Sequence, residues 1–507
     1  MATLDSLHFV NTYARLHPAF YEVVEPTPVP DPYLVAFNPD AAELLDLDPS
    51  RIDRQELTQV LAGNRRLPGS EPIAEAYAGH QFGVWVPQLG DGRAFLLGQV
   101  VNRHGESWDL HLKGGGRTRF SRFGDGRSVL RSAIREYLAC EALHGLGIPT
   151  TRALGIAGSD LPVQRERTET AATLIRLAPT HVRFGTFEYF ASRGEVERVV
   201  ELLEYVVSAS RRLGGSAVRG PSDIQTPRRP DVRTSIEPAV QFFKEVCERT
   251  ARLMAKWIAV GFAHGVMNTD NMSILGITLD YGPYGFLERY DAGFICNHTD
   301  EEGRYAFGRQ PAVGLWNCAR LGEALAVLDP ALTKEPENAD LLAPWQAALE
   351  SYWPAFNLEY LRLMREKLGL LSARDQEDAE LIKELLGILQ EEGLDYTNFF
   401  RQLSEMPGPP GAETPNRLSG WLSRYRLRVE ESVDVERRAR MRRVNPKYVL
   451  RNWIAQEAIE QAERKEFGLL ESLRMLFRDP YAEHPDFARF AQPASGAARE
   501  LVVSCSS

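Results

Sequence analysis

The side chains best suited to chemistry lie in one short stretch, AHGVMNTDNMSILGITLDYGPYG, at residues 263–285. Asp270 and Asn271 are neighbours there, and Asp280 follows further along the same stretch. Carboxylate and amide oxygens are the hard ligands that Mg²⁺ prefers, usually together with the phosphates of a substrate. The same residue types also form surface turns. This stretch alone therefore leaves a metal site and a turn as equal alternatives.

Two further stretches combine glycine with basic side chains. QLGDGRAFLLGQV places Gly90, Gly92 and Arg93 between two predicted strands. Glycine lets a backbone approach phosphate closely and arginine adds charged hydrogen bonds, yet a plain hairpin turn is the favoured interpretation of this motif alone. LHLKGGGRTRFSRFGDGRS is a stronger signal, because Lys113 ends a strand and arginines follow, interleaved with glycine, up to a Gly-Asp-Gly at residues 124–126. In an acidic chain this favours contact with a polyanion over a solvated loop.

The helix predicted after this basic loop carries Glu136. Protein kinases hold their phosphate-binding lysine through an ion pair between a strand lysine and a helix glutamate, and Lys113 with Glu136 has that order. Glu136 could equally pair with a neighbouring arginine for structure alone. The pattern therefore predicts a buried glutamate and leaves its partner open.

The stretch at 263–285 follows the kinase order with one departure. Against the kinase pattern His-x-Asp-x-x-x-x-Asn, His264 takes the histidine position and Asn271 the metal-binding asparagine, and the Asp-Tyr-Gly that begins at Asp280 matches Asp-Phe-Gly. Val266 stands where the catalytic aspartate belongs. The metal ligands are thus kept while the usual base is absent, and Asp270 is the carboxylate that remains in this loop.

Strands dominate the first part of the chain, and helices the second. Short strands of an antiparallel sheet are predicted over 81–113, a helix capped by Ser128 follows, and 160–179 returns to strand alternation. Amphipathic or apolar helices are predicted over 195–213, 236–262, 340–400 and 440–480, with loops at 214–235 and 404–420. This order predicts an α+β fold with two lobes, like that of a protein kinase. The expected segments are an N-terminal extension (1–75), a sheet-rich lobe (76–190), a helical lobe with the catalytic and metal-binding loops (191–330), and a helical C-terminal region (331–507).

Bulk composition narrows the class of protein. A net charge of −10 over 507 residues argues against general nucleic-acid binding. No apolar run is long enough to cross a bilayer, and the N-terminus lacks the basic region of a secretory signal. Five cysteines without CxxC spacing fit neither a disulfide scaffold nor a zinc site. We expect a cytoplasmic protein that binds neither membranes nor nucleic acid.

The motifs together resemble the selenoprotein O (SelO/YdiU) family, protein adenylyltransferases on a pseudokinase fold. The resemblance spans nearly the whole chain except 214–235, which looks like an insertion. The stretches that carry it are EAYAGHQFGVWVPQLGDGRAFLLG, HLKGGGRTRFSRFGDGRSVLRSAIREYLACEALHGLGIPTTRAL, VRFGTFE, GFAHGVMNTDNMSILGITLDYGPYGFLE and the C-terminal SCSS.

The resemblance implies a role for each matching position. It implies Asp270 as the proton acceptor, Asn271 and Asp280 as Mg²⁺ ligands, and Glu136 as the partner of Lys113. It also implies that the nucleotide is bound flipped relative to kinases, so that AMP is transferred from ATP to Ser, Thr or Tyr hydroxyls of proteins. The implied nucleotide-binding residues are Gly90, Gly92, Arg93, Lys113, Asp125, Gly126, Arg176, Arg183 and Asp280.

Three functions remain in competition from the sequence. Adenylyl transfer follows from the resemblance, phosphoryl transfer by a kinase-like enzyme is disfavoured by Val266, and a non-catalytic nucleotide-binding scaffold is disfavoured by the retained charged groups. The sequence does not decide whether UTP with Mn²⁺ also serves as a substrate.

The tail ELVVSCSS ends the chain with a cysteine in an unusual context. The resemblance implies a redox role for Cys505, because eukaryotic family members hold selenocysteine at this position; a spectator thiol is the alternative. Cys296 is the expected partner if the tail reaches a second thiol. The remaining cysteines are expected in the core: Cys140, Cys247 and Cys318.

Overall fold

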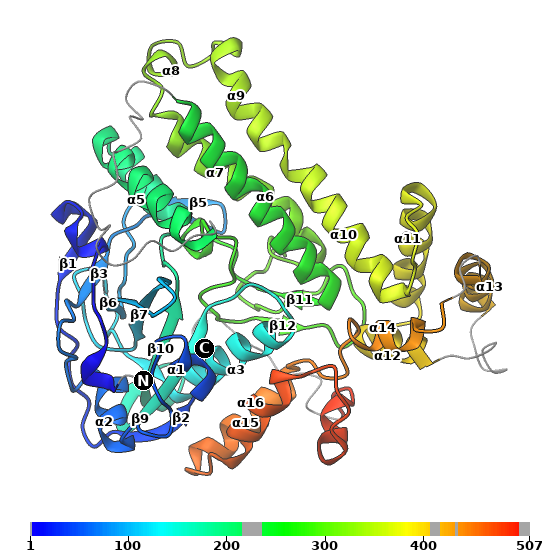
Figure 1. Ribbon diagram of the computed structural model, residues 1–507, viewed down its shortest axis with the longest axis horizontal. Helices are drawn as coiled ribbons and strands as arrows, with labels where there is room; N and C mark the ends of the chain where they lie inside the picture. Colours follow the sequence, from blue (N-terminus) through cyan, green and yellow to red (C-terminus); the bar gives the residue numbers. More distant parts are fainter. Residues whose placement is uncertain (1–2, 215–235, 406–415, 431–433, 496–507) are drawn as a thin grey trace.

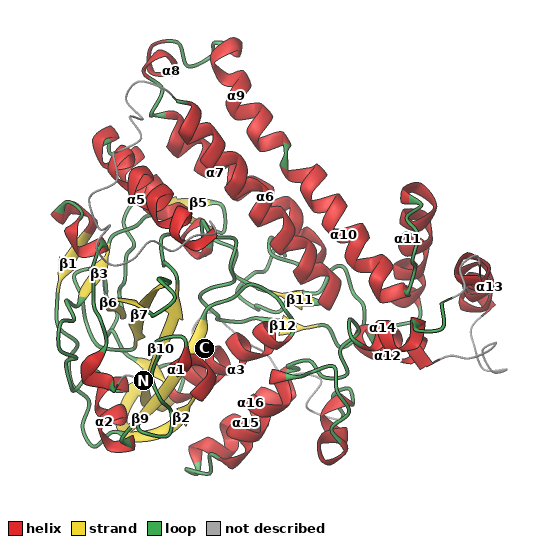
Figure 2. Ribbon diagram, in the orientation of Figure 1, coloured by secondary structure: helices red, strands yellow, loops and turns green. Residues whose placement is uncertain are grey.

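The computed structural model describes residues 3–214, 236–405, 416–430 and 434–495, and it has the expected mixture of sheet and helix (Figures 1 and 2). An antiparallel sheet with strand order β1-β3-β6-β7-β10-β9-β2, with β8 paired to β10, forms one side of the molecule. Most of the predicted loop at 214–235, part of the loop at 404–420 and the cysteine tail lie outside the described residues. The strands of this sheet are β1 (Tyr21–Val23), β2 (Tyr33–Phe37), β3 (Ile73–Glu75), β6 (Ala94–Val101), β7 (Ser107–Lys113), β8 (Ser128–Val129), β9 (Arg152–Gln164) and β10 (Thr168–Ala178).

Strand β7 shows how the sequence builds one polar and one apolar face. Successive side chains of a strand point to opposite sides of the sheet. Leu110 and Leu112 enter an apolar cluster, while Asp109, His111 and Lys113 share the other face and are buried as well. A buried polar face needs partners, and these are supplied by β10 and α3 (Leu130–Gly145).

The first 75 residues are part of the sheet and not an appendage to it. They provide β1 and β3 at one edge and β2 at the other, where β2 pairs with β9. The largest buried cluster takes residues from Tyr13 to Ala491, so all four expected segments contribute to one core.

Most of the helices lie in the second half of the chain, and many of them extend beyond the sheet (Figure 1). The predictions for 195–213, 236–262, 340–400 and 440–480 are confirmed by α5, α6, α9 to α12, and α14 to α16. These and the other helices are α1 (Pro39–Glu43), α2 (Arg54–Leu61), α4 (Phe184–Ala191), α5 (Val196–Gly214), α6 (Glu237–Val260), α7 (Gln310–Ala326), α8 (Pro330–Lys334), α9 (Ala339–Glu350), α10 (Tyr352–Leu368), α11 (Asp375–Glu391), α12 (Tyr396–Glu405), α13 (Asn416–Glu430), α14 (Arg437–Arg442), α15 (Asn452–Glu463) and α16 (Gly468–Arg478).

The predicted cap of α3 is wrong. Ser128 belongs to the short strand β8, where it pairs with Ala172, and α3 begins only at Leu130. Val129 precedes the helix without a side-chain cap. Strand pairing has therefore taken the residue that local propensity assigned to the helix.

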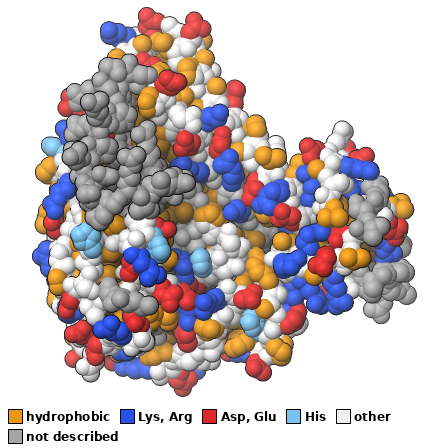
Figure 3. Space-filling model, in the orientation of Figure 1, with side chains coloured by type: hydrophobic (Ala, Val, Ile, Leu, Met, Phe, Trp, Pro, Cys, Tyr) orange, Lys and Arg blue, Asp and Glu red, His pale blue; other side chains and the backbone are white. Residues whose placement is uncertain are grey.

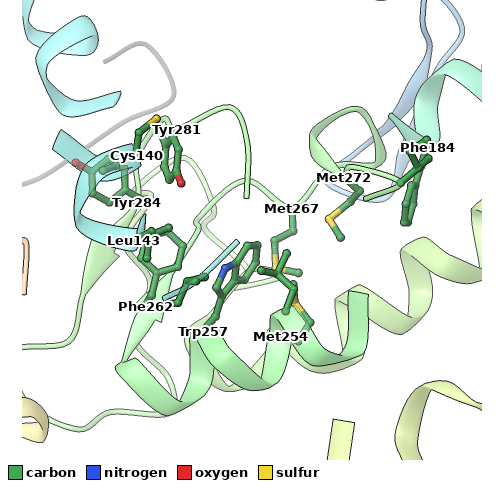
Figure 4. Close-up of a cluster of buried hydrophobic side chains, with 14 of the residues drawn as sticks. Cys140, Leu143, Phe184, Met254, Trp257, Phe262, Met267, Met272, Tyr281 and Tyr284 are labelled. Atoms are coloured by element: carbon green, nitrogen blue, oxygen red, sulfur yellow. The ribbon is translucent and has the colours of Figure 1, made fainter. Parts of the chain in front are cut away.

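The loop at 264–284 is held between two short paired strands above an aromatic core. Helix α6 leads into β11 (Phe262–Ala263), which pairs with β12 (Gly285–Phe286). Trp257 of α6 lies beside Phe262 and Met267 (Figure 4), and its ring stacks on His264 with centroids 5.3 Å apart. This apolar support fixes the loop from below.

The surface carries both signs of charge. On the face drawn in Figure 3, acidic and basic side chains lie interspersed among apolar ones. Among the described residues, no helix combines the length and the apolar character that a membrane span requires.

Candidate active site

A cavity of about 590 Å³ gathers nearly all of the site residues that the sequence indicated. It is bounded by the loop before β6, the end of β7, the basic loop before β8, and the loop between β11 and β12. Glu136 lies behind Lys113, and Cys296 does not line this cavity. The predicted residues that line it are Gly90, Gly92, Arg93, Lys113, Asp125, Gly126, Arg176, Arg183, Asp270, Asn271 and Asp280.

Lys113 and Glu136 form an ion pair beside the cavity. The Nζ atom of Lys113 lies 2.5 Å from Oε2 of Glu136, and Arg176 Nη1 lies 3.1 Å from the other carboxylate oxygen. Both partners that the sequence left open, the lysine and an arginine, thus bind the same glutamate. Burial lowers the pKa of Lys113, and the carboxylates of Glu136 and Asp280 oppose that shift.

Asp280 is held between two buried arginines. Its Oδ1 lies 2.5 Å from Arg176 Nη1 and 3.8 Å from Lys113 Nζ, and its Oδ2 accepts a hydrogen bond from Arg183 Nη1. Burial alone would raise the pKa of Asp280, but the charges of Arg176, Arg183 and Lys113 hold it well below its ordinary value. Asp280 is therefore an anion at neutral pH.

A buried histidine orients one of these arginines. His111 Nδ1 accepts a hydrogen bond from Arg176 Nε at 3.1 Å, which assigns the proton to His111 Nε2, 3.1 Å from Asp91 Oδ2. Burial lowers the pKa of His111, so the neutral ring fits this arrangement. Asp91 also lies 3.8 Å from Arg183 Nη2. The chain Asp91–His111–Arg176 fixes the guanidinium against the cavity.

The glycines at 90 and 92 do not form the hairpin turn that their motif favoured. The strands on either side do not pair with each other, since β5 (Val84–Val86) pairs with β4 (Gly79–Gln81) and β6 pairs with β3 and β7. Gly90 has φ +117°, and a Cβ there would lie 2.4 Å from the ring of Phe120. Glycine is thus required for this loop to pack on the basic loop and expose its backbone to the cavity.

Asp125 lies at the outer rim of the cavity. Its carboxylate is 2.8 Å from Arg165 Nη1 and accepts a hydrogen bond from the backbone N–H of Arg127 at 2.8 Å. Burial contributes a raising effect on the pKa of Asp125, but the hydrogen bond from Arg165 is the largest influence and lowers it. The rim therefore presents an anion that is paired with Arg165.

Asp270 and Asn271 stand on a 3₁₀ turn, Thr269–Asn271, with Val266 nearby. Asn271 Nδ2 donates to the carbonyl of Val266 at 3.0 Å, which leaves its Oδ1 available. The carboxylate of Asp270 is buried, and burial raises its pKa to about 7. Arg183 Nη1 binds the backbone carbonyl of Asp270 at 3.0 Å and leaves the carboxylate to other contacts.

The donor set fits a divalent cation shared with phosphate oxygens. Asn271 and Asp280 line the same cavity and offer one amide oxygen and an ionised carboxylate. Mg²⁺ usually takes only one or two carboxylates from the protein and completes its shell with water and substrate phosphates. The described residues contain no group of three or more His, Cys, Asp or Glu placed to hold a metal by themselves.

Cys296 lies under the loop at 264–284 and not at the surface. It is 7% exposed, and its thiol lies 3.6 Å from the carbonyl oxygen of Ala263. A Cβ on Gly265 would come within 2.6 Å of its sulfur. Its pairing with Cys505, which lies outside the described residues, stays a prediction. The core positions expected of the other three cysteines are confirmed for Cys140, Cys247 and Cys318.

Several residues of the site escaped the sequence reasoning. Tyr77, Gln81, Asp91 and Arg165 line the cavity, and His111 stands behind it. Arg183 lies over the ring of Tyr77, with its Cζ 4.5 Å from the centroid. The stretch EAYAGHQFG was visible as a family motif, but nothing in its residue types pointed to a particular contact.

Comparison with known proteins identifies the family of this chain. The sequence model of the family described as "Protein adenylyltransferase SelO" matches residues 3–477. Relatives named "Protein nucleotidyltransferase YdiU" from Myxococcus xanthus, Thioalkalivibrio sulfidiphilus and Thiobacillus denitrificans are 53%, 49% and 47% identical, each over 100% of both chains. The resemblance drawn from the motifs is thereby confirmed, and the chain belongs to the SelO family of protein adenylyltransferases.

Proposed function

We propose that this enzyme transfers AMP from ATP to Ser, Thr or Tyr hydroxyls of proteins, on a two-lobed fold of the protein-kinase type. The observation that carries the proposal is one cavity in which Lys113, Arg176 and Arg183 face an ionised Asp280, with a second carboxylate, that of Asp270, in the lining of the same cavity. Val266 occupies the place of the kinase base. Such a cavity suits a polyphosphate substrate and a hydroxyl nucleophile.

The distribution of positive charge supports a nucleotide whose terminal phosphates point inward. Arg176 and Arg183 are each 1% exposed and form the floor of the cavity, whereas Arg93 is exposed at its mouth. The β- and γ-phosphates carry most of the charge of ATP, so they gain most from the buried guanidinium groups. The α-phosphate is then left toward the acceptor, and pyrophosphate is the leaving group.

Asn271 and Asp280 would hold Mg²⁺, or Mn²⁺ in its place. The bound ion would supply neutralisation of the phosphate oxygens. The chain itself contributes the fixed cations, because Lys113 is held by Glu136 and Arg176 is held by His111. Preorganised charges of this kind stabilise the charge that develops on the transferring group and on the leaving pyrophosphate.

Asp270 would accept the proton of the acceptor hydroxyl. Its Oδ1 is buried and has no hydrogen-bond partner among the described residues. As the hydroxyl oxygen forms its bond to the α-phosphorus, the bond from that phosphorus to the β-phosphate bridging oxygen breaks, and the proton passes to the carboxylate. The products are an AMP-modified side chain and pyrophosphate.

The test is the intact mass of acceptor proteins after incubation with the enzyme, ATP and Mg²⁺. A panel of acceptors is incubated in parallel with ATP labelled on the α- or on the γ-phosphate. We expect an AMP-sized adduct that carries only the α-label. A phosphate-sized adduct with the γ-label would establish a kinase-like reaction instead, and binding of ATP without any adduct would establish a scaffold.

A further inference from the structure

The small hairpin formed by β4 and β5 lies outside the large sheet and packs on the loop that carries Asp270. Three successive hairpin residues each donate a hydrogen bond to one of three successive loop residues. These bonds run from His80 N to Thr269 Oγ1 at 2.7 Å, from Gln81 Nε2 to Asp270 Oδ2 at 3.2 Å, and from Phe82 N to Asn268 Oδ1 at 3.1 Å. The hairpin is thus matched to the catalytic loop residue by residue.

The backbone of the hairpin approaches Asp270 as closely as a chain can. A Cβ on Gly79 would lie 2.8 Å from Asp270 Oδ1 and 3.0 Å from Asp270 N. Only glycine fits at this position. Any side chain here would push the carboxylate from its place, so the hairpin also limits where the carboxylate can turn.

The turn of the hairpin is held in an unfavourable conformation by the same loop. Phe82 has φ +51° and Gly83 has φ +83°, a left-handed pair that is costly for phenylalanine. The N–H of Phe82 also donates to the hydroxyl of Tyr305 at 2.9 Å, and the two rings lie 5.1 Å apart. Strained backbone persists only where its surroundings hold it, and such positions gather at functional sites.

Gln81 is the side-chain donor to the Asp270 carboxylate within the described residues. Its bond to Oδ2 fixes the plane of the carboxylate, while Oδ1 has no partner there. Arg183, the nearest cation, binds the backbone carbonyl of Asp270. The carboxylate is therefore fixed on both sides, with Oδ2 bound by Gln81 and Oδ1 buried against the backbone of Gly79.

We propose that Gln81 is a positioning residue that holds the Asp270 carboxylate in the orientation in which it meets the incoming acceptor hydroxyl. The proposal rests on the proposed function, in which Asp270 accepts the proton. Gln81 lines the same cavity, and in this scheme it acts through its hydrogen bond to Asp270. Its loss should lower turnover and leave ATP binding intact, because misplacing a reacting group by about 1 Å can cost roughly 10²-fold in rate.

The experiment compares Gln81→Leu and Gln81→Glu with wild type in the full-length enzyme. Leu removes the donor, and Glu keeps the shape of glutamine but replaces the donor by a negative charge. Val84→Ala is the matched control, since Val84 is opposite Gln81 in the hairpin and its side chain is exposed. Turnover is measured on the acceptor that takes an AMP adduct from wild type, together with ATP affinity and unfolding temperature.

We expect kcat to fall about 10- to 100-fold in both Gln81 variants, with ATP affinity and unfolding temperature near wild type, and Val84→Ala to behave as wild type. In an Asp270→Ala background, Gln81→Leu should have no further effect, because its only route of action has been removed. Additive losses in that background, or wild-type turnover in both single variants, would overturn the proposal. Absence of any adduct from wild type would contradict the proposed function itself, which keeps the two failures distinct.

Discussion

Two carboxylates in this enzyme are each held between two arginines, and they differ in what surrounds them. Asp280 lies between Arg176 and Arg183 at the cavity, where its side chain keeps 18% of its exposure. Asp378 lies between Arg365 and Arg428, at 2.7 Å and 3.0 Å, with none of its side chain exposed. The same residue types thus build an open cluster in one region and a closed one in the other.

The closed cluster uses its hydrogen-bonding capacity to join three helices. Arg365 comes from α10, Asp378 from the first turn of α11 and Arg428 from α13, and the backbone N–H of Arg374 adds a bond to Asp378 at 2.9 Å. Nη2 of Arg428 also donates to the carbonyl of Ser372 at 2.6 Å. A buried charge cluster of this kind serves the structure, because each partner is already matched.

The open cluster around Asp280 contains buried hydrogen-bond donors that no described residue binds. Nε and Nη2 of Arg183 are buried without a hydrogen-bond partner among the described residues, and the cavity lies directly beside them. Unmatched buried donors are costly unless something else binds them. The comparison teaches that unmatched donors next to a cavity, more than buried charge itself, distinguish a site from a structural clamp.

The largest expected effect comes from removing the open carboxylate. Asp280→Ala should reduce adenylyl transfer to background, since it removes the proposed metal ligand and the anion that holds both arginines. Asp378→Ala should keep kcat within about twofold of wild type when assayed below its unfolding temperature. Turnover of both variants is measured over a Mg²⁺ titration.

A second measurement tests independently whether Asp280 binds the metal ion. Mn²⁺ bound to the enzyme is followed by electron paramagnetic resonance in the presence of ATP, and we expect weaker binding in Asp280→Ala than in Asp378→Ala. Near wild-type transfer by Asp280→Ala at saturating Mg²⁺ would contradict the metal assignment and remove the basis of the comparison.

Part of the candidate site around Asp280 could be predicted from the sequence. Lys113 and Glu136 could be predicted because a strand end, a glycine loop and a helix follow one another locally. The roles of Arg176 and Arg183 came only through the family resemblance, since their partner Asp280 is remote in sequence. Gln81 and Asp270 lie 189 residues apart, and no local periodicity encodes such a contact.

The fold was predictable to a similar extent. Helices with a clear apolar face, such as α5 and α6, agree with their predicted ranges within a few residues. The sheet was harder, because pairing depends on distant strands: β5 pairs with β4 and leaves β6 to β3 and β7. Pairing also moved Ser128 from a helix cap into β8.

Asp270 offers a third case, a buried carboxylate whose oxygens contact no arginine within the described part of the chain. Asp270→Ala should lower kcat by about 10² to 10⁴, the usual contribution of a general base, with ATP affinity nearly unchanged. Single-turnover rates and ATP titrations separate the two quantities. A large loss of ATP binding with preserved turnover of the bound complex would place Asp270 in the metal site beside Asp280.

The effects on the free energy of unfolding should have the opposite order from the effects on turnover: Asp378→Ala should lose more stability than Asp280→Ala. Asp378→Ala leaves Arg365 and Arg428 buried without their partner, which typically costs about 3–5 kcal/mol. Asp280→Ala should cost less, because water in the cavity can solvate the arginines it releases. Chemical denaturation of both variants measures the difference, and an equal or larger loss for Asp280→Ala would show that the open cluster is also a structural clamp.

The Lys113–Glu136 pair should couple ATP binding to the open cluster. A double-mutant cycle with Lys113→Ala and Glu136→Ala should give a coupling free energy of about 1–3 kcal/mol in ATP affinity. Glu136→Ala alone should have the larger effect, because Glu136 also binds Arg176. Isothermal titration of ATP with Mg²⁺ provides the four affinities, and strict additivity would count against the pairing.

The smallest effect concerns a buried charge that has neither a carboxylate partner nor a cavity. Lys367 of α10 is 4% exposed, no carboxylate pairs with it among the described residues, and its Nζ lies 4.3 Å from the ring centroid of Phe400. Burial lowers its pKa from 10.5 to about 7. Below pH 7 both folded and unfolded chains hold the proton, so the folded state bears the full cost of burying the charge. Between pH 7 and 10.5 only the unfolded chain holds it, and stability therefore rises with pH across that window.

Replacing this lysine should consequently stabilise the enzyme in a pH-dependent way. Lys367→Met removes the cost of the buried charge and loses its contact with the aromatic ring, for a net gain of about 1–2 kcal/mol at neutral pH and below. The gain should shrink as pH rises from about 7 toward about 10, where the wild-type lysine becomes neutral in both states. Denaturation at about pH 6 and about pH 9 measures this, with Lys383→Met on the exposed face of α11 as the control. The prediction is contradicted if the gain is the same at both pH values, or if Lys383→Met reproduces it. Burial of the Lys367 charge would then cost the folded state little, and this protein would tolerate a buried cation without a carboxylate partner or a cavity beside it.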